Sequence, residues 1–177
     1  MRVVLLKSIC VCLAIVSCTI PTRADLVHDV CSKSNRDPNY CEEAIRSAPG
    51  SATGDLATLG QVVINLTISQ VSPIENLIFV LKRQSTDEKL KERLSSCLED
   101  FNDCRNDLND CRGLLQAKDY SDLVFKVEAA EDGPDGCDTS FDDGVPPEPD
   151  QLKQASARIQ VLIEAINIIS ETLDGSV

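Results

Sequence analysis

The stretch 86–117 has the clearest pattern of apolar and polar positions in the chain. Its apolar residues recur at alternating steps of four and three: Leu90, Leu94, Cys97, Phe101, Cys104, Leu108, Cys111 and Leu115. This spacing predicts an α-helix with one narrow buried stripe, and Ser85 with Glu88 has the spacing of a capping box that would start it. A helix of about 32 residues is about 48 Å long and unstable alone, so we expect the stripe to pack against other long helices.

Three other segments also have helical spacing. Residues 55–83 have an apolar and a polar side, with a kink or a restart expected at Pro73. A shorter helix is expected after 118–120, ending near Asp132 and followed by a turn at 133–136. The last helix is expected over 151–173, and its stripe is the most apolar in the chain. No segment alternates with period two, so the pattern predicts an all-α, antiparallel four-helix bundle over 55–173.

Residues 25–48 predict a small helical hairpin that precedes the bundle. Segments 26–35 and 41–47 have helical patterns, and the sequence Asp-Pro-Asn at 37–39 predicts the turn between them. Cys31 and Cys41 would meet across this turn, where a disulfide that closes so short a loop contributes about 3 kcal/mol in the chain-entropy treatment. Residues 48–54 are expected to be a linker.

The first 24 residues have the features of a secretory signal peptide. Arg2 and Lys7 precede an apolar run through Ile20, and small residues up to Ala24 offer a cleavage site. The run is too short for a transmembrane helix, and no later stretch reaches about 18 apolar residues. We therefore expect a secreted domain of residues 25–177 with no membrane anchor.

Charge and cysteine content narrow the class of protein further. The basic residues of the signal take the basic count from 17 to about 14 against 29 acidic residues, a net charge of about −15 that argues against nucleic acid or anionic lipid as partners. Three of the nine cysteines lie in the signal, and the other six are expected in an oxidising compartment. Residues seven apart on a helix are about 10.5 Å apart, so neighbours among Cys97, Cys104 and Cys111 cannot bridge each other.

The sequence offers little for catalysis. His28 is far in sequence from a serine or cysteine nucleophile, so a solvated imidazole is the better interpretation. Neither zinc nor calcium spacing occurs, and phosphate-binding glycine loops are missing, so we expect no metal and no cofactor. Asn65 begins a glycosylation sequon whose occupancy is left open. The acids on the outer side of 86–117 fit either a docking surface or an ordinary solvated face: Glu99, Asp100, Asp103, Asp107 and Asp110.

Several short motifs follow one another in an order typical of one family. After the cysteine pair around the proline-containing hairpin come CLEDF at 97–101, KDY at 118–120, EAA at 128–130, and Cys137 followed by Asp138 and Phe141. In this combination the chain resembles the plant invertase and pectin methylesterase inhibitor family over nearly its whole mature length. Residues 55–59 with 65–66 are also similar to a branch of that family that is labelled as invertase inhibitors and includes pollen allergens.

The resemblance implies a four-helix bundle with an N-terminal helical hairpin and two disulfides, Cys31–Cys41 and Cys97–Cys137. The second bridge would clamp the second long helix to the end of the third, and contributes about 4 kcal/mol by the same entropy treatment. Cys104 and Cys111 are then left over, either as small buried hydrophobes or as the link in a homodimer.

The resemblance further implies a secreted protein inhibitor in the apoplast or cell wall, or alternatively in the vacuole. In pectin methylesterase inhibitors, acidic and polar residues cover the enzyme's substrate cleft, and the matching positions here are Glu99, Asp103, Asn106, Gly136 and Thr139. Asn106 and Thr139 depart from the family pattern, because acids are expected there. The Pro-Lys-Phe tripeptide of invertase inhibitors is absent. We therefore expect docking on a pectin methylesterase, with acid invertase as the alternative and a helical interaction protein without an enzyme target as the third hypothesis.

Overall fold

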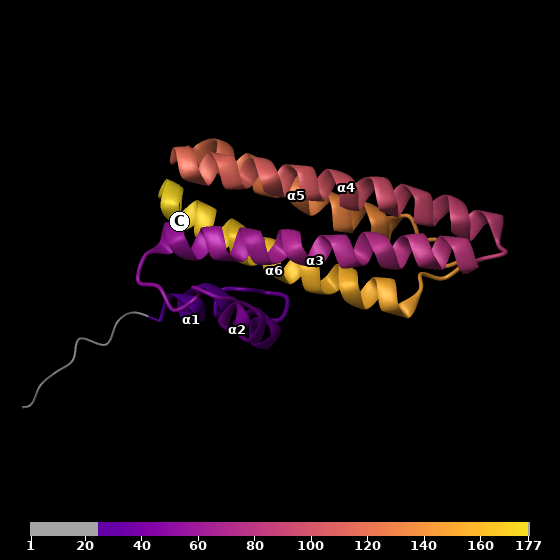
Figure 1. The fold of residues 1–177 in the computed structure, drawn as a ribbon, viewed down its shortest axis with the longest axis horizontal. Coiled ribbons are helices and arrows are strands. Elements are labelled where there is room, and N and C mark those ends of the chain that lie inside the picture. Colours follow the sequence, from indigo (N-terminus) through magenta and orange to yellow (C-terminus); the bar gives the residue numbers. More distant parts are fainter. Residues whose placement is uncertain (1–24, 177) are drawn as a thin grey trace, which may run out of the picture.

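A computed structural model describes residues 25–176 as an all-helical protein. The signal peptide predicted at 1–24 lies outside the described residues. The helices are α1 (Leu26–Cys31), α2 (Pro38–Ser47), α3 (Leu56–Gln84), α4 (Glu88–Ala117), α5 (Tyr120–Thr139) and α6 (Asp150–Asp174). In Figure 1 the four long helices α3 to α6 lie alongside one another, and the short helices α1 and α2 sit at one end of them.

The four long helices form a closed antiparallel bundle, as predicted. Helix α4 packs against α3 and α5, and α6 packs against the same two helices from the other side. The connections are short at both ends of α4, where Asp87 caps its first turn and Lys118 ends it in a left-handed conformation (φ 59°). The predicted buried stripe of α4 is confirmed from Leu94 to Leu115, whereas Leu90, in the first turn of the helix, is only partly buried.

Helix α5 is longer than the sequence pattern predicts. It runs through residues 133–136, where a turn was expected, and ends at Thr139. Pro134 costs the helix one N–H donor, but its own carbonyl accepts a hydrogen bond from Ser156 of α6 at 3.4 Å. Gly133 lets the helix approach α4 closely enough for the Cys97–Cys137 disulfide to form. Tertiary packing therefore overrides the local turn signal.

Helix α3 continues through Pro73, so of the two predicted alternatives, a kink or a restart, the restart is excluded. Three other boundaries differ from the prediction. Helix α4 is capped by the Asp87 carboxylate rather than by Ser85. Helix α1 ends at Cys31 instead of continuing to residue 35, and α2 begins at Pro38. Asp37 accepts a hydrogen bond from the Tyr40 amide at 3.0 Å, so the expected turn is an N-cap followed by proline in the first helical position.

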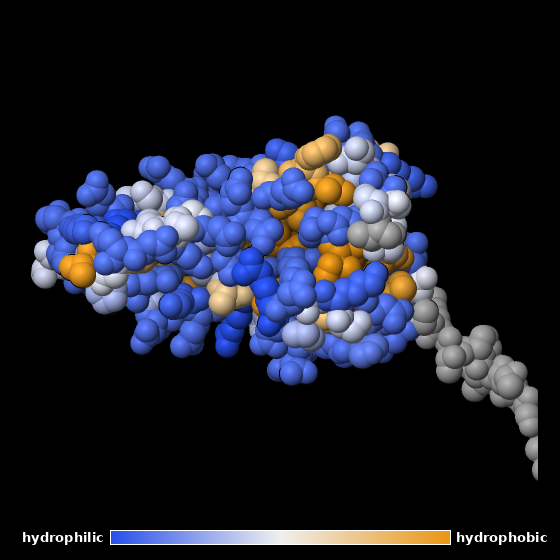
Figure 2. Space-filling model, turned by 180° about the vertical axis from the view of Figure 1, so that it is seen from behind, coloured by the Kyte–Doolittle hydropathy of each residue, from blue (hydrophilic) through white to orange (hydrophobic). Residues whose placement is uncertain are grey.

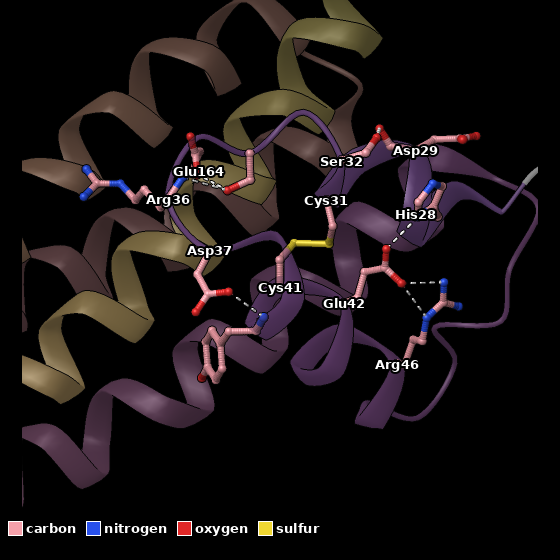
Figure 3. The surroundings of a disulfide bond; sticks show 12 residues. His28, Asp29, Cys31, Ser32, Arg36, Asp37, Cys41, Glu42, Arg46 and Glu164 are labelled. Carbon is pink, nitrogen blue, oxygen red and sulfur yellow. Dashed lines mark hydrogen bonds and ion pairs between the residues drawn. A yellow bond between two sulfur atoms is a disulfide. The ribbon is translucent and has the colours of Figure 1, made fainter.

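The N-terminal hairpin is attached to the bundle by polar contacts as well as by its disulfide-bonded core. The Cys31–Cys41 bridge joins α1 and α2, and Glu164 of α6 lies beside the loop that carries Arg36 (Figure 3). Glu164 accepts hydrogen bonds from the Ser34 hydroxyl and from the Asn35 amide. Arg36 donates to Gln160 of α6 and to Glu131 of α5, each at 2.8 Å. The hairpin thus docks on α6 and α5 through the connection between its two helices.

Helix α3 is the one described helix that is long and apolar enough by composition to cross a membrane. It lies between α4 and α6 in the bundle, and eight of its residues are buried there. Its apolar side is therefore the side that faces the bundle core.

Candidate docking surface

The predicted partner-binding residues of α4 share one outward face of that helix. Glu99, Asp103 and Asn106 are spaced by four and three residues, and all three are exposed. The buried stripe with Cys97 and Cys104 lies on the opposite side of the helix, which orients these three side chains away from the core.

Helix α5 brings the other two predicted positions next to this face. The Cys97–Cys137 disulfide holds the two helices with a Cα–Cα distance of 4.4 Å. One residue before the bridge, Gly136 faces Asp100, because a Cβ built on it would lie 3.4 Å from the carboxylate. Thr139 is exposed one turn further on, and its hydroxyl donates to the Asp135 and Gly136 carbonyls at 2.9 and 3.0 Å. The structure therefore brings the α4 and α5 positions together.

The α4–α5 face is electrostatically negative around Glu99 and Asp103. Glu99 and Asp103 make no ion pair within residues 25–176, whereas Asp107, nearer the C-terminal end of α4, pairs with Lys126 of α5 at 3.1 Å. Partial burial, with Asp103 and Glu99 close by, raises the pKa of Asp100 above its ordinary value. The two unpaired carboxylates thus remain available to cations on a partner.

The remaining cysteines are buried thiols. Cys104 and Cys111 are free and fully buried in the bundle, and burial raises the pKa of each thiol to about 12. A disulfide between two chains through either sulfur would require the bundle to open. In the described part of the chain both are small core residues, as in the first of the two predicted alternatives, small buried hydrophobes or the link in a homodimer.

A group of possible metal ligands lies where α5 ends. Atoms of Cys137, Asp138 and Glu148 are within 4.8 Å of one another, but the Cys137 sulfur is already committed to the disulfide. Asp138 accepts hydrogen bonds from Ser156 at 2.7 Å and Gln160 at 3.0 Å. Without Cys137, the group consists of the carboxyl groups of Asp138 and Glu148. Burial beside Asp138 raises the pKa of Glu148 to about 7.

Two further predicted residues lie away from the α4–α5 face. Asn65 is exposed on α3, where its side-chain oxygen accepts a hydrogen bond from Gln61 at 3.3 Å. Thr67, the third residue of the sequon, is buried, and its hydroxyl donates to the Val63 carbonyl at 2.8 Å. His28 is exposed on α1 and pairs with Glu42 of α2 at 2.6 Å (Figure 3). The imidazole therefore links the two helices of the hairpin.

Fold and surface together define a disulfide-stabilised helical-bundle protein with exposed, unpaired carboxylates on its α4–α5 face. Residues 25–170 match the family described as plant invertase/pectin methylesterase inhibitor, and the chain belongs to that family. Over 151 residues it is 36% identical to a protein named "Pectinesterase inhibitor" from Actinidia deliciosa, which covers 85% of this chain and 80% of the relative. It is 26% identical over 114 residues to "Pectinesterase inhibitor 2" from Arabidopsis thaliana, covering 64% of this chain and 65% of the relative. These relatives are named as inhibitors and not as enzymes.

Solved structures show the same fold. A crystal structure of a mutant form of a pectin methylesterase inhibitor from Arabidopsis matches with a TM-score of 0.72 at 20% identity, covering 80% of this chain and 93% of that one. A second crystal structure, of a pectin methylesterase inhibitor from Arabidopsis thaliana, matches with a TM-score of 0.64 at 19% identity, covering 85% of this chain and 97% of that one. The predicted bundle with its N-terminal hairpin is therefore confirmed.

Proposed function

We propose that this protein inhibits a pectin methylesterase by docking on it non-covalently. The observation that carries the proposal is the 36% identity, over most of both chains, to a protein named as a pectinesterase inhibitor. The acidic face agrees with this role, because unpaired carboxylates on a rigid support favour association with a partner of complementary charge. No covalent chemistry is needed for a protein that only covers a substrate cleft.

In the proposed complex the α4–α5 face lies across the enzyme's cleft. Glu99 and Asp103 supply negative charge, while Asn106 and Thr139 offer uncharged hydrogen-bonding groups beside them. Gly136 keeps the surface between the two helices low, since no side chain rises over Asp100. The disulfide and the close α4–α5 packing hold these groups in place before binding, which lowers the entropic cost of association.

Acid invertase is the alternative target, because the family description names inhibitors of both enzymes. Acid invertase is the second candidate because the sequence lacks the Pro-Lys-Phe tripeptide of invertase inhibitors. The proposal locates the mature protein in the cell wall, where a pectin methylesterase would be met; a vacuolar location belongs to the invertase alternative.

The two targets are separated by titration. Purified mature protein with intact disulfides is added to a fixed amount of a plant pectin methylesterase, and in parallel to an acid invertase, and residual activity is measured. We expect methylesterase activity to fall towards zero near one equivalent and invertase activity to stay constant. Loss of invertase activity alone supports the alternative, and full activity of both enzymes leaves the interaction protein without an enzyme target.

A further inference from the structure

A second feature of the α4–α5 face is an open hollow beside an exposed phenylalanine. The hollow has a volume of about 650 Å³ and lies between the C-terminal half of α4 and the N-terminal half of α5. It is lined by Asn109, Asp110, Gly113, Leu114, Asp122, Phe125, Lys126 and Ala129. Phe125 is 67% exposed, which is unusual for so large an apolar side chain in a small secreted domain.

The hollow is continuous with the proposed docking residues along both helices. On α4, Glu99, Asp103 and Asn106 are followed at the same helical spacing by Asp110 and Gly113. On α5, which runs the other way, Thr139 and Gly136 are followed by Asp132, Ala129 and Phe125, also at steps of three and four. Both rows therefore stay on one face of the helix pair, and Phe125 lies about 21 Å along α5 from Thr139.

Gly113 leaves space in the hollow because it has no side chain. Gly113 has no heavy atom within 4 Å of the position a Cβ would take, so the space above it is free for a side chain from outside. Leu114, Ala129 and Phe125 are the apolar lining residues of the hollow. It lies at the end of the bundle where α5 begins and α6 ends (Figure 1). Figure 2 shows that hydrophilic residues cover most of the back of the molecule, and that apolar residues gather near this same end.

Charge around the hollow selects the kind of partner. Asp110 and Asp122 are exposed at its rim, and Lys126, its only lining cation, is already paired with Asp107 and Asp110 at 3.1 and 3.6 Å. The rim is therefore net negative. A second copy of this chain would bring its own carboxylates against these, so a partner with lysine or arginine around an apolar side chain fits better.

We propose that the hollow beside Phe125 receives an apolar side chain from a basic loop of the pectin methylesterase. Phe125 is then the aromatic anchor at one end of the docked face, and Glu99 marks the other end. This inference rests on the proposed function and adds to it a hydrophobic contact that the acidic residues alone do not supply. Buried aromatic anchors commonly carry a large share of the binding energy of such interfaces.

The test compares inhibition constants for the methylesterase among four proteins. Phe125→Ala removes the anchor, and Gly113→Leu fills the hollow from within. Both are expected to weaken inhibition about tenfold or more, with a melting temperature no lower than that of the wild type. Phe79→Ala is the matched control, because Phe79 is also half exposed, at 49%, but lies on α3 outside this face.

Each outcome has a distinct meaning. Wild-type inhibition with both variants within twofold of it overturns the anchor and leaves the proposed function intact. A wild-type protein that does not inhibit the methylesterase overturns the proposed function and the anchor with it. Sedimentation of the free protein tests whether a second copy of the chain occupies the hollow. A monomer is expected, and a dimer that Phe125→Ala dissociates would assign the hollow to a second copy instead.

Discussion

Gly133 of α5 lies directly against the backbone of α4 at Asp100. A Cβ added to Gly133 would come within 2.6 Å of the Asp100 carbonyl oxygen and 2.7 Å of the Cys104 Cβ. The first contact is with main-chain atoms, which cannot rotate away. This close approach sets the spacing of the two helices beside the Cys97–Cys137 bridge, and therefore the relative position of Glu99 and Gly136 on the proposed docking face.

Replacement of Gly133 by alanine is expected to lower the free energy of unfolding by about 1–3 kcal/mol, since overpacking at a backbone contact outweighs the better helix propensity of alanine. Chemical denaturation monitored by circular dichroism measures the change. Gly113→Ala is the matched control, because nothing lies within 4 Å of its Cβ position on α4. There alanine should be neutral or stabilising by about 0.5–1 kcal/mol. Equal effects of the two substitutions would contradict the packing described here.

The cysteine arrangement predicts a defined pattern of labelling. The folded domain should take up no alkylating reagent over the time in which a small free thiol reacts fully, because Cys104 and Cys111 are buried and their pKa values are raised to about 12. Denatured, unreduced protein should gain two labels, and reduced protein six, as measured by mass spectrometry. Rapid labelling of the folded protein would show that the core opens more readily than its packing implies.

His28 gives the hairpin a measurable pH dependence. Its hydrogen bond to Glu42 raises the pKa of the imidazole above 6.5. While Glu42 is ionised, this contact therefore stabilises the hairpin fully below pH 6.5, and the stabilisation is lost as pH rises through the folded-state pKa. As the chain has a single histidine, its proton resonances can be followed without ambiguity in untagged protein. Glu42→Gln should lower the pKa of His28; an unchanged titration curve would mean that the pair does not form in solution.

Asp138 and Glu148, the carboxyl pair at the end of α5, should make the protein less stable as pH rises, whereas an ion-paired carboxylate makes it more stable. Burial beside Asp138 raises the pKa of Glu148 from 4.5 to about 7. Between these values the unfolded chain has released a proton that the folded chain keeps, so the free energy of unfolding falls as pH rises through this window. Lys153 partly offsets the shift.

Glu148→Gln should flatten this part of the stability curve. Melting temperature is compared for the two proteins from pH 4 to pH 8, and the variant is expected to gain on the wild type above about pH 6. Parallel curves would place Glu148 in solvent and remove its coupling to Asp138.

The long-range pattern of apolar residues was enough to predict the bundle, because the buried stripe of α4 and the long α6 follow helical spacing without interruption. Boundaries set by tertiary contacts were less accessible. Gly133 and Pro134 favour a turn when taken locally. Only the neighbouring α4 backbone and the Ser156 hydroxyl of α6 show why a helix continues there. The cap of α4 is likewise ambiguous in sequence, because Ser85 with Glu88 has the spacing of a capping box, while the Asp87 carboxylate makes the capping hydrogen bonds.

The sequence itself predicts only part of the spatial grouping of the proposed docking residues. Helical spacing alone puts Glu99, Asp103 and Asn106 on one face, whereas Gly136 and Thr139 join them through a resemblance and through packing between helices. The hollow beside Phe125 was missed. In the sequence, Phe125 lies four residues before Ala129 and so on the same side of its helix. This spacing indicates a hollow only when Gly113 is known to lie beside it on α4.

The claim that the α4–α5 face covers the enzyme is tested most directly by charge reversal. Inhibition constants for a pectin methylesterase are measured for Glu99→Lys/Asp103→Lys and for Asp29→Lys/Glu43→Lys, which makes the same change of charge at exposed residues of the hairpin. We predict that the first variant inhibits at least about tenfold more weakly at unchanged melting temperature, and that the second inhibits like the wild type. Equal inhibition by both variants, or equal weakening of both, would contradict docking through this face.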